Sequence, residues 1–562
     1  MAEPQASTAS GRPNEPSGPN SQNRANKPNK KNDSSESRKL RQARADRIDP
    51  ALLRIAGIIL VGTVVVQLDT TIVAVAIDTL SRSFGVGIST IQWVSTGYML
   101  ALAMVIPLTG WSVERFGGKR MWMLSLALFL AGSALCGVAW SAGSMIVFRV
   151  LQGVGGGMLL PLMQTLLAQA AGPQRMGRLM ATVAVPALVT PILGPVIGGV
   201  ILDNLSWRWI FLINIPVCLV ALLLAWRGLP DVRIPGRHPL DVRGFVLLSP
   251  ALAAVVYGFS AAGSRGSFSD VEAIVPLVVG VVLLVLFIAH ALVTTVEPII
   301  DLRMFRSRAF AGSSGIMFIA GISLFGAMLL LPLYEQQVRG RSAVDAGLLL
   351  APQGIGMMIA VIVVGRLADR GATRLLVLTG LVLSVLGTVA HTQVGTDTSE
   401  WLLGASLALR GVGLAAVMIP VMSAVYHGLR QDEIPRATSA VRIFQQIGGS
   451  LGTAVLAVVL AHGIAARGGS AQVDAAGLAD AFGETFWWTL ALTAVAVPCA
   501  FLLPGRLAAP APTSSSASSG GSGGSVRPAP PEQATGMDEA GLLPGAARTA
   551  ATPSPGLNKG RA

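Results

Sequence analysis

Residues 53–77 read LRIAGIILVGTVVVQLDTTIVAVAI, and within this stretch only Arg54 and Asp69 carry a charge. About twenty consecutive apolar residues are enough for a helix to cross a bilayer. Further apolar stretches of similar length follow, separated by polar, Gly-containing or Pro-containing turns, at approximately 90–111, 121–140, 144–168, 179–202, 208–228, 243–262, 273–296, 310–333, 344–364, 373–392, 401–426, 438–463 and 484–504. The sequence therefore predicts an all-α polytopic membrane protein with fourteen transmembrane helices.

The composition of the chain argues against a soluble protein and against an enzyme. Of the 562 residues, 52% are hydrophobic and 13% are charged, whereas about 25% are charged in a typical soluble protein. The sequence has no phosphate-binding G-x-x-x-x-G-K-[ST] motif, and no nucleophile, base and orienting group recur within one region. Cys136, Cys218 and Cys499 all lie inside apolar stretches, so neither a disulfide framework nor a metal site is expected. We expect no catalysis, no cofactor and no ATP-driven pumping.

Both ends of the chain are polar. Residues 1–52 are rich in Asn, Ser, Pro, Arg and Lys, and residues 505–562 contain a Ser/Gly-rich run at 514–525. Because neither end has enough apolar residues to form a core, we expect two disordered tails. The basic N-terminal tail is either a solvated leader or a segment that binds anionic lipid. Much of the formal charge of +13 lies in tails and loops, so it does not indicate a nucleic-acid partner.

The distribution of Lys and Arg predicts how the helices are oriented. Short cytoplasmic loops carry an excess of these residues. With their flanks, the loops after stretches 2, 4, 6, 8, 10 and 12 contain seventeen Lys and Arg, against six in the odd-numbered loops. We therefore expect a multi-pass protein of the cytoplasmic membrane with both termini in the cytoplasm.

An internal similarity predicts two related halves. The loop sequence Gly110-Trp-Ser-Val-Glu-Arg-Phe-Gly-Gly-Lys-Arg120 resembles Gly365-Arg-Leu-Ala-Asp-Arg-Gly-Ala-Thr-Arg374. Related halves are common in secondary transporters. We predict six-helix bundles at 53–228 and 310–504, joined by a linker at 229–309 that contains transmembrane helices 7 and 8.

Asp69 is a carboxyl group deep in an apolar stretch. It lies about sixteen residues into the first stretch, roughly 24 Å from the cytoplasmic end at 1.5 Å per residue. Burial penalises the charged form of a carboxyl group, so such a residue can take up and release a proton, and intramembrane acids often mark proton relays. The alternative is a structural cap or a fixed ion pair.

Two arginines occupy corresponding places in the two halves. Arg149 begins the sequence Arg149-Val-Leu-Gln-Gly153, in which Gln152 and Gly153 share its helix face. A cation there can pair with a nearby acid in one conformation only; a fixed salt bridge, or a side chain reaching the outer interface, is the alternative. Arg410, in the twelfth stretch, looks like its counterpart.

Two other features leave alternatives open. Pro191, Gly194, Pro195 and Gly198 make the fifth stretch either a hinge or a tightly packed helix. Glu335, at the outer end of the ninth stretch, is either an attractor for a cationic substrate or a hydrated interfacial acid. We interpret Glu297 and Asp301 as loop anchors.

Taken together, eight short motifs resemble one family, the fourteen-span drug:proton antiporters of the major facilitator superfamily. They span about residues 53–505 and occur in the order of that family: Leu68-Asp-Thr-Thr-Ile-Val73, Ile91-Gln-Trp-Val-Ser-Thr-Gly-Tyr98, Gly110–Arg120, Arg149–Gly153, Gly194-Pro-Val-Ile-Gly-Gly199, Ser206–Pro216, Glu297–Leu302 and Pro332–Gly340. The absence of Lys from the body of the chain after Lys119 looks like a GC-rich genome, and with the family it suggests an actinobacterial exporter.

The resemblance implies the major facilitator fold and proton-driven export of amphiphilic drugs, antibiotics or toxic metabolites by alternating access. It implies that Asp69 carries the coupling proton and that Arg149 is its electrostatic partner. Gln152, Arg410, Glu335 and Tyr98 become candidates for contact with substrate. The implied cytoplasmic gate consists of Gly110, Glu114, Arg115, Gly117, Lys119, Arg120, Asp369 and Arg370, and the implied antiporter motif contains Gly194, Pro195, Gly198 and Gly199.

The chain departs from the family pattern at several positions, including Ala74, Asp78, Glu114 and Thr190, so the resemblance does not name the cargo. We expect a monomer whose partners are an amphiphilic small molecule, protons and lipid, with the proton gradient as energy source. Two alternatives stay open: a dedicated exporter of a single secondary metabolite or siderophore, and a non-transporting membrane sensor with the same fold.

Overall fold

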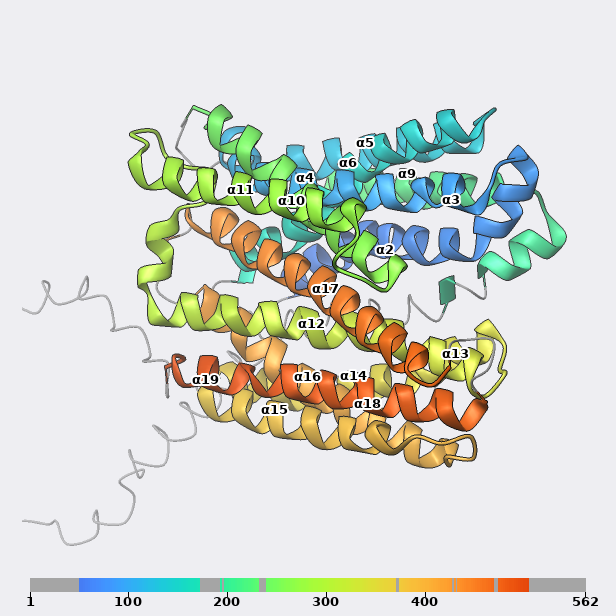
Figure 1. Cartoon of the computed structure of the whole chain (residues 1–562). Coiled ribbons are helices and arrows are strands. Elements are labelled where there is room, and N and C mark those ends of the chain that lie inside the picture. The colour runs from blue at the N-terminus through green and yellow to red at the C-terminus, as the bar shows by residue number, and fades with distance from the viewer. Residues whose placement is uncertain are drawn as a thin grey trace, which may run out of the picture. The chain divides into compact units, whose positions relative to one another are not determined.

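The apolar stretches form helices, and every described element of the computed structural model is helical (Figure 1). The structure describes residues 50–171, 193–194, 197–231, 239–369, 373–426, 429–430, 432–468 and 474–504. Within these ranges, thirteen helices are long and apolar enough to cross a membrane. The prediction of an all-α polytopic membrane protein is confirmed. Most of the predicted fifth stretch, 179–202, residues 1–49 of the predicted N-terminal tail and all of the predicted C-terminal tail lie outside the described residues. Residues 50–52, predicted to end the disordered N-terminal tail, instead begin the first helix.

The two halves repeat one packing pattern. In the first half, α6 packs between α4 and α5, and α2 packs on α9. In the second half, α16 (Glu400–Val425) packs between α14 (Ala351–Asp369) and α15 (Thr373–Val389), and α12 (Arg308–Gln337) packs on α18 (Ala475–Ala494). The first-half helices are α2 (Pro50–Phe84), α3 (Ile88–Ile91), α4 (Trp93–Phe116), α5 (Gly118–Gly137), α6 (Ala142–Ala171), α8 (Trp209–Leu212) and α9 (Asn214–Gly228).

The second half begins after the short 3₁₀ helix η1 (Leu302–Arg306). Its helices are α12 (Arg308–Gln337), α13 (Ala343–Leu349), α14 (Ala351–Asp369), α15 (Thr373–Val389), η2 (Ala390–Gln393), α16 (Glu400–Val425), α17 (Ile434–Ala465), α18 (Ala475–Ala494) and α19 (Ala496–Phe501). The shared pattern agrees with the internal similarity in the sequence. The exact domain boundaries stay a prediction.

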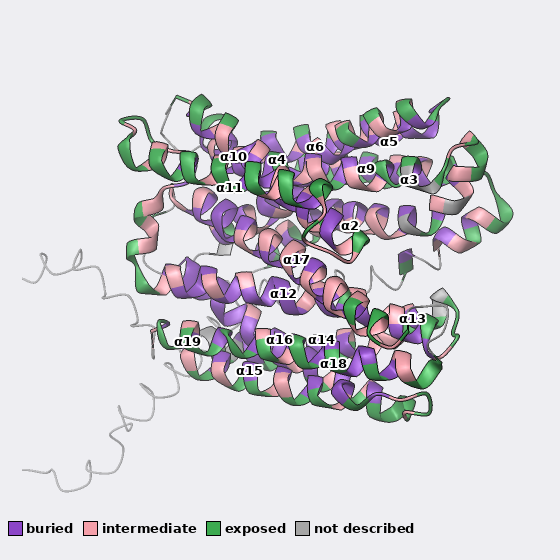
Figure 2. Ribbon diagram, in the orientation of Figure 1, coloured by how far each residue is buried: buried purple, intermediate pink, exposed green. Residues whose placement is uncertain are grey.

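Between the halves, α10 (Val242–Arg265) and α11 (Val271–Val293) form a helical hairpin. Asp241, which caps α10 by accepting from the Gly244 amide, also lies 2.8 Å from Nε2 of His290 on α11. Helix α10 packs on α4 and on α17, so the hairpin covers a junction of the two halves. Helix α11 is mostly exposed in the isolated chain (Figure 2), which is what a lipid-facing helix requires.

The apolar cores show where the halves meet. One core combines Ile106 of α4 and Ala168 of α6 with residues of α10, α11 and the second half. The cores at the opposite end are separate: one contains only first-half residues such as Ile72 and Phe211, and another only second-half residues such as Phe482. Among the described residues, the halves are therefore joined at the end where α4 finishes and α17 begins.

Candidate functional site

Asp69 is enclosed by hydrogen-bond donors from other helices. Its Oδ2 atom lies 2.5 Å from Nη1 of Arg149 on α6. Its Oδ1 atom accepts from Nε2 of Gln152 and from Nδ2 of Asn214, each at 2.9 Å. Asn214 also donates to Ser133 Oγ on α5 at 3.0 Å. Both carboxylate oxygens are thus satisfied, which a charged group needs when its side chain is 0% exposed.

The helices place this cluster deep within the first half. Asp69 lies near the middle of α2, which runs from Pro50 to Phe84, and Asn214 is the first residue of α9. A buried charge in a spanning helix is costly and is usually functional. The position predicted from sequence, well inside the first helix, agrees with this placement.

Arg149 has a second set of contacts besides Asp69. Its guanidinium carbon lies 4.1 Å from the ring centroid of Tyr98 on α4, within the range of a cation–π interaction. Its Nη1 atom donates to Gln152 Oε1 at 2.9 Å, and its Nε atom donates to the Val94 carbonyl at 3.3 Å. The cation therefore keeps polar and aromatic partners when its bond to Asp69 breaks.

Gln152 is held in place by the close approach of α5 and α6 at Gly132. A Cβ atom on Gly132 would lie 2.6 Å from the Cα atom of Gln152 and 2.7 Å from its backbone nitrogen. Because the obstructing atoms are backbone, a side chain at Gly132 must push the two helices apart.

We expect Gly132→Val to lower thermal stability, with a destabilisation of about 1–3 kcal/mol from overpacking. Gly57→Val is the matched control, because a Cβ atom at Gly57 meets nothing within 4 Å among the described atoms. Thermal unfolding of both purified variants measures the difference. Equal stability of the two variants would contradict the assigned packing.

Arg410 occupies the corresponding position in the second half but has different partners. It is 2% exposed, donates from Nη1 to Gln353 Oε1 at 2.8 Å, and donates from Nη2 to the carbonyl and hydroxyl of Ser323 at 2.6 and 3.1 Å. None of these partners carries a charge. Among the described residues of the second half, no carboxylate pairs with Arg410 in the way that Asp69 pairs with Arg149.

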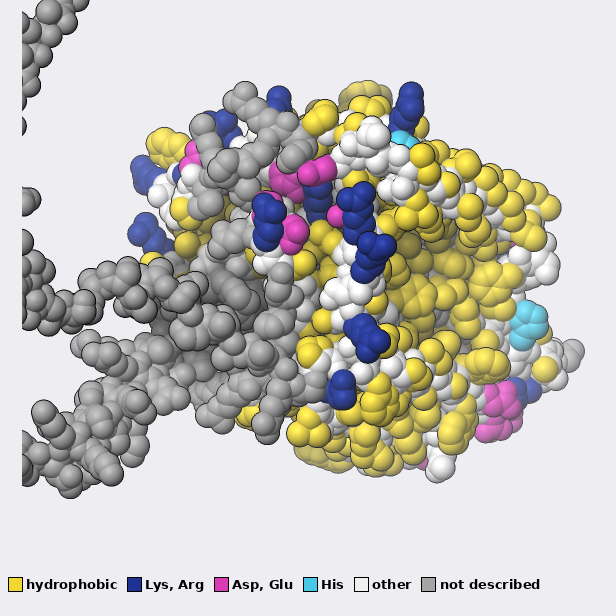
Figure 3. Space-filling model, turned by 90° about the vertical axis from the view of Figure 1, so that its left-hand side faces the viewer, with side chains coloured by type: hydrophobic (Ala, Val, Ile, Leu, Met, Phe, Trp, Pro, Cys, Tyr) yellow, Lys and Arg dark blue, Asp and Glu magenta, His cyan; other side chains and the backbone are white. Residues whose placement is uncertain are grey.

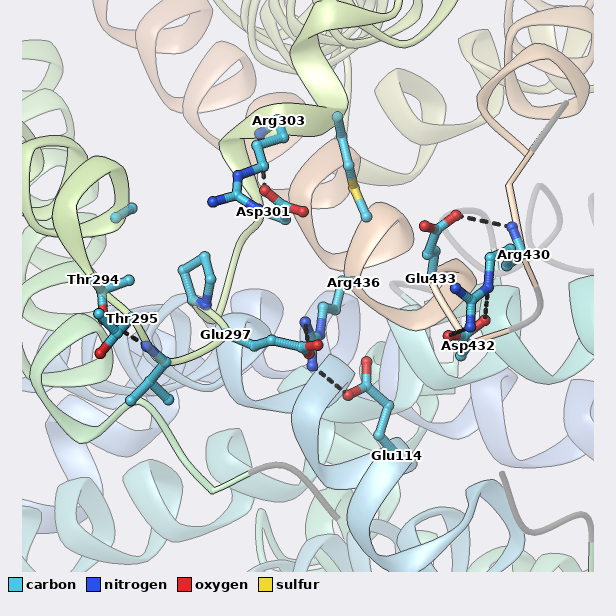
Figure 4. Close-up of a pocket in the computed structure, with 14 residues that line it drawn as sticks. Glu114, Thr294, Thr295, Glu297, Asp301, Arg303, Arg430, Asp432, Glu433 and Arg436 are labelled. Carbon is cyan, nitrogen blue, oxygen red and sulfur yellow. Dashed lines mark hydrogen bonds and ion pairs between the residues drawn. The ribbon is translucent and has the colours of Figure 1, made fainter. Parts of the chain in front are cut away.

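A cluster of charged residues joins the halves where α4 ends and α17 begins (Figure 4). Arg436 of α17 donates from Nη2 to Glu114 Oε2 of α4 at 2.6 Å. Its Nη1 atom lies 2.6 Å from Oε2 of Glu297, which follows the hairpin. A cavity of about 240 Å³ opens beside these residues. One arginine therefore links the first half, the second half and the segment after α11.

Of the other gate candidates, Gly110 lies against the cluster, several follow it near the end of α4 and the start of α5, and two are not described or only partly described. A Cβ atom on Gly110 would lie 3.2 Å from the Arg436 backbone, and Gly117 joins α4 to α5 with φ of +88°. Lys119 donates to the Trp226 carbonyl at 2.7 Å. Arg115 and Arg120 are exposed. The side chain of Asp369 and all of Arg370 lie outside the described atoms.

Glu335 is buried, not a hydrated interfacial acid. Its side chain is 5% exposed and lies 3.0 Å from Nη1 of Arg339, one helical turn away. Arg339 also donates to the Thr398 carbonyl at 3.3 Å. An acid whose charge is neutralised by an arginine attracts a cation only weakly. The arrangement therefore does not favour Glu335 as the residue that attracts a cationic substrate.

Only part of the predicted antiporter motif is described. A Cβ atom on Gly194 would collide with Thr71, and one on Gly198 would lie 3.3 Å from Ile72. These glycines therefore let their segment approach α2 beside Asp69. A Cβ atom on Gly199 would meet no described atom within 4 Å, and Pro195 lies outside the described residues.

The helical pattern and the buried charges agree with a comparison of the sequence with protein families. The family model described as Major Facilitator Superfamily matches residues 59–453. The chain belongs to the Major Facilitator Superfamily.

Individual relatives of this superfamily member include transporters named for drug resistance. It is 41% identical to the multidrug resistance protein B homolog of Mycobacterium tuberculosis, over 74% of this chain and 78% of the relative. It is 31% identical to the multidrug export protein EmrB of Haemophilus influenzae, over 72% of this chain and 80% of the relative. The expectation of a multidrug efflux family, with an actinobacterial relative, is confirmed.

A solved structure supports the fold of this superfamily member. The human organic anion transporter MFSD10 matches with a TM-score of 0.55 and 17% identity, over 79% of this chain and 100% of the other. At that identity the match shows the fold alone. The predicted major facilitator fold is confirmed.

Several residues of this superfamily member were missed by sequence reasoning. Asn214 and Ser133 complete the Asp69 cluster. Asn214 lies within the Ser206–Pro216 motif, but neither residue has a charge that marks it as a partner of Asp69, and both lie far from Asp69 in the chain. The sequence does not predict that Arg436, one of the seventeen Lys and Arg of the even-numbered loops, joins the halves, and it predicts Glu297 only as a loop anchor. Arg442 was overlooked, although a charged residue inside the apolar stretch 438–463 was a visible signal.

Proposed function

We propose that this transporter is a proton-coupled antiporter that exports amphiphilic drugs, antibiotics or toxic metabolites across the cytoplasmic membrane. The observation that carries the proposal is the Asp69 carboxylate, buried in a spanning helix with the long side chain of Arg149 as its charged partner. The names of the relatives in Mycobacterium tuberculosis and Haemophilus influenzae support drug export. The proton gradient supplies the energy, and the protein works as a monomer without a cofactor.

Protons and Arg149 compete for the same carboxylate. In the state described here, Asp69 accepts three hydrogen bonds, and its charge is balanced by Arg149. A proton on Asp69 removes the charge that holds Arg149, which then relies on Tyr98, Gln152 and the Val94 carbonyl. The rearrangement alters the packing of α2, α4 and α6, so protonation of Asp69 biases the equilibrium between conformations.

The joined ends of the halves indicate which step of the cycle this structure represents. The halves share an apolar core and the Arg436 cluster at the end where α4 finishes. Lys and Arg side chains gather on this end, beside broad apolar flanks (Figure 3), as expected of a cytoplasmic surface. If both termini lie in the cytoplasm, as we propose, the joined end is cytoplasmic, and we infer an outward-facing state in which protons are taken up and substrate has been released.

The test is substrate-driven proton release from acidified inverted vesicles. Inverted vesicles that contain the transporter are energised to acidify their interior, and amphiphilic dyes and antibiotics are then added singly. Antiport predicts an alkalinisation of the interior for some compounds, absent from vesicles without the transporter. A response to only one compound class favours a dedicated exporter. Complete silence, with the protein shown to be folded and inserted, contradicts the proposal and favours a non-transporting sensor.

A further inference from the structure

The buried charges of the spanning helices are not balanced between the two halves. The described spanning helices contain three buried carboxylates, Asp69, Glu114 and Glu335, and each pairs with an arginine. Arg410 and Arg442 of the second half contact no carboxylate in the described chain: Arg410 is held by Gln353 and Ser323, and Arg442 donates from Nη1 to Gln445 Oε1 at 2.6 Å. Among the described side chains of the spanning helices, buried positive charge therefore exceeds buried negative charge.

Of these two arginines, Arg442 is the first residue of a polar strip on α17 that consists of Arg442, Gln446, Ser450 and Thr453. At 100° per residue, Arg442, Gln446, Ser450 and Thr453 share one face of the helix. The opposite face carries Phe444, Leu451, Val455 and Val458. Every residue of the strip is half-buried. A spanning helix turns such a polar face away from lipid.

The contacts of α17 locate this strip. On one side of it, Gly448 and Gly452 lie against Phe318 and Ile322 of α12, and on the other side Ala454 lies against Gly263 of α10. The strip lies between these two packed faces. Helix α17 also packs on α4 and α6 of the first half, so the strip faces the junction of the halves.

Among the described atoms, the strip has one buried hydrogen-bond donor without a partner, and it belongs to Arg442. The hydroxyl groups of Ser450 and Thr453 donate to carbonyls of their own helix. The Nε atom of Arg442 is buried and has no hydrogen-bond partner among the described atoms. An unpaired donor on a cation is stabilised by a negatively charged acceptor, and the planar guanidinium suits a carboxylate, phosphate or sulfonate.

We propose that the substrates of this transporter carry an anionic group, and that Arg442 binds it. This inference rests on the proposed export function and refines its substrate class. Every buried carboxylate in the described spanning helices is already paired with an arginine, so a cationic substrate would find no free carboxylate among them. An anionic substrate, in contrast, would be attracted by Arg442. A membrane potential that is negative inside also favours the exit of an anion.

The test compares two xanthene dyes of similar size, the anionic carboxyfluorescein and the cationic rhodamine 6G. Fluorescence anisotropy with the full-length purified protein gives a Kd for each. We expect the wild type to bind carboxyfluorescein at least about tenfold more tightly than rhodamine 6G, and Arg442→Gln to lose this preference. Arg442→Lys should keep most of it, which separates charge from folding. Arg467→Gln, beyond the far end of the same helix, should match the wild type.

Two results would overturn the inference: a wild type that prefers rhodamine 6G or fails to bind carboxyfluorescein, or an Arg442→Gln variant with wild-type Kd for both dyes. The proton-release assay separates this inference from the proposed function. If rhodamine 6G drives proton release equally in the wild type and in Arg442→Gln, antiport stands and the anionic assignment falls. If carboxyfluorescein binds through Arg442 but no dye releases protons, the binding site stands and antiport falls.

Discussion

Asp69→Asn is expected to abolish substrate-driven proton release, lowering it by about 100-fold or more, because Asn cannot exchange a proton at the buried site. The amide keeps nearly the shape of the carboxyl group. It can still accept hydrogen bonds through its single oxygen, so substrate binding should change far less than coupling. Parallel measurement of dye binding and proton release in inverted vesicles separates the two effects.

The control for Asp69→Asn tests the effect of the unpaired Arg149 charge that the substitution creates. Removing one partner of a buried ion pair typically costs about 3–5 kcal/mol, because the other charge is then uncompensated. Asp69→Asn should therefore also lose thermal stability. The double variant Asp69→Asn/Arg149→Gln removes both charges and should recover stability while still failing to couple.

Asp69→Glu adds a second test of the same site. A carboxyl group one methylene longer still titrates but is misplaced with respect to Gln152 and Asn214, so we expect reduced but measurable coupling. Full coupling in Asp69→Asn, with the protein properly inserted, would contradict the assignment and move the coupling proton to another carboxyl group.

Arg436→Glu is expected to open the end where the two halves are joined. The change places three acids together, because Glu114 and Glu297 both lie 2.6 Å from Arg436 in the wild type. Loss of the nearly buried pair with Glu114, and the new repulsion, should weaken the closed state by about 3 kcal/mol or more, roughly a 100-fold shift in population. Transport should fall, because one conformation of the cycle is disfavoured.

Accessibility of a single cysteine measures this opening. Ile106 is 1% exposed in the shared core. The substitution Ile106→Cys is made in a chain without its native cysteines, and a membrane-impermeant maleimide is added to inverted vesicles. We expect Arg436→Glu to raise the labelling rate by at least about tenfold. Arg467→Glu, beyond the other end of the same helix, should leave it unchanged. An unchanged rate in Arg436→Glu would show that the cluster does not hold this end closed.

The two acids of the cluster, Glu114 and Glu297, should contribute differently to the stability of the closed state. The Glu114 side chain is 8% exposed, whereas that of Glu297 is 47% exposed. Exposed ion pairs contribute about 0–1 kcal/mol, much less than buried ones. Glu297→Gln should therefore raise maleimide labelling at position 106 only slightly, and Glu114→Gln should raise it strongly. In that case the Arg436–Glu297 pair contributes little to closure, and the Arg436–Glu114 pair between the two halves keeps this end closed.

The Asp69 site shows how far sequence reasoning reached. The depth of Asp69 in an apolar stretch was sufficient to single it out, and family motifs suggested Arg149 as its partner. The Ser206–Pro216 motif contains Asn214, but neither Asn214 nor Ser133 could be assigned to Asp69 in this way, because a neutral polar residue in a helix is common and pairs only with what folding brings near it. Glu335 shows the converse: its position suggested hydration, but Arg339, one turn away, neutralises it inside the protein.

The helical membrane architecture, the related halves and the most important charged residues followed from the amino-acid sequence without a structure. Lipid imposes these features locally, since each spanning helix must be apolar and must satisfy its own backbone, and each exception is conspicuous. Which charges are compensated became visible only in the folded chain, where Asp69, Glu114 and Glu335 pair with arginines and Arg442 contacts no described carboxylate. That outcome depends on distances between helices far apart in the chain, and electrostatic interactions in a low-dielectric interior change steeply over a few ångströms.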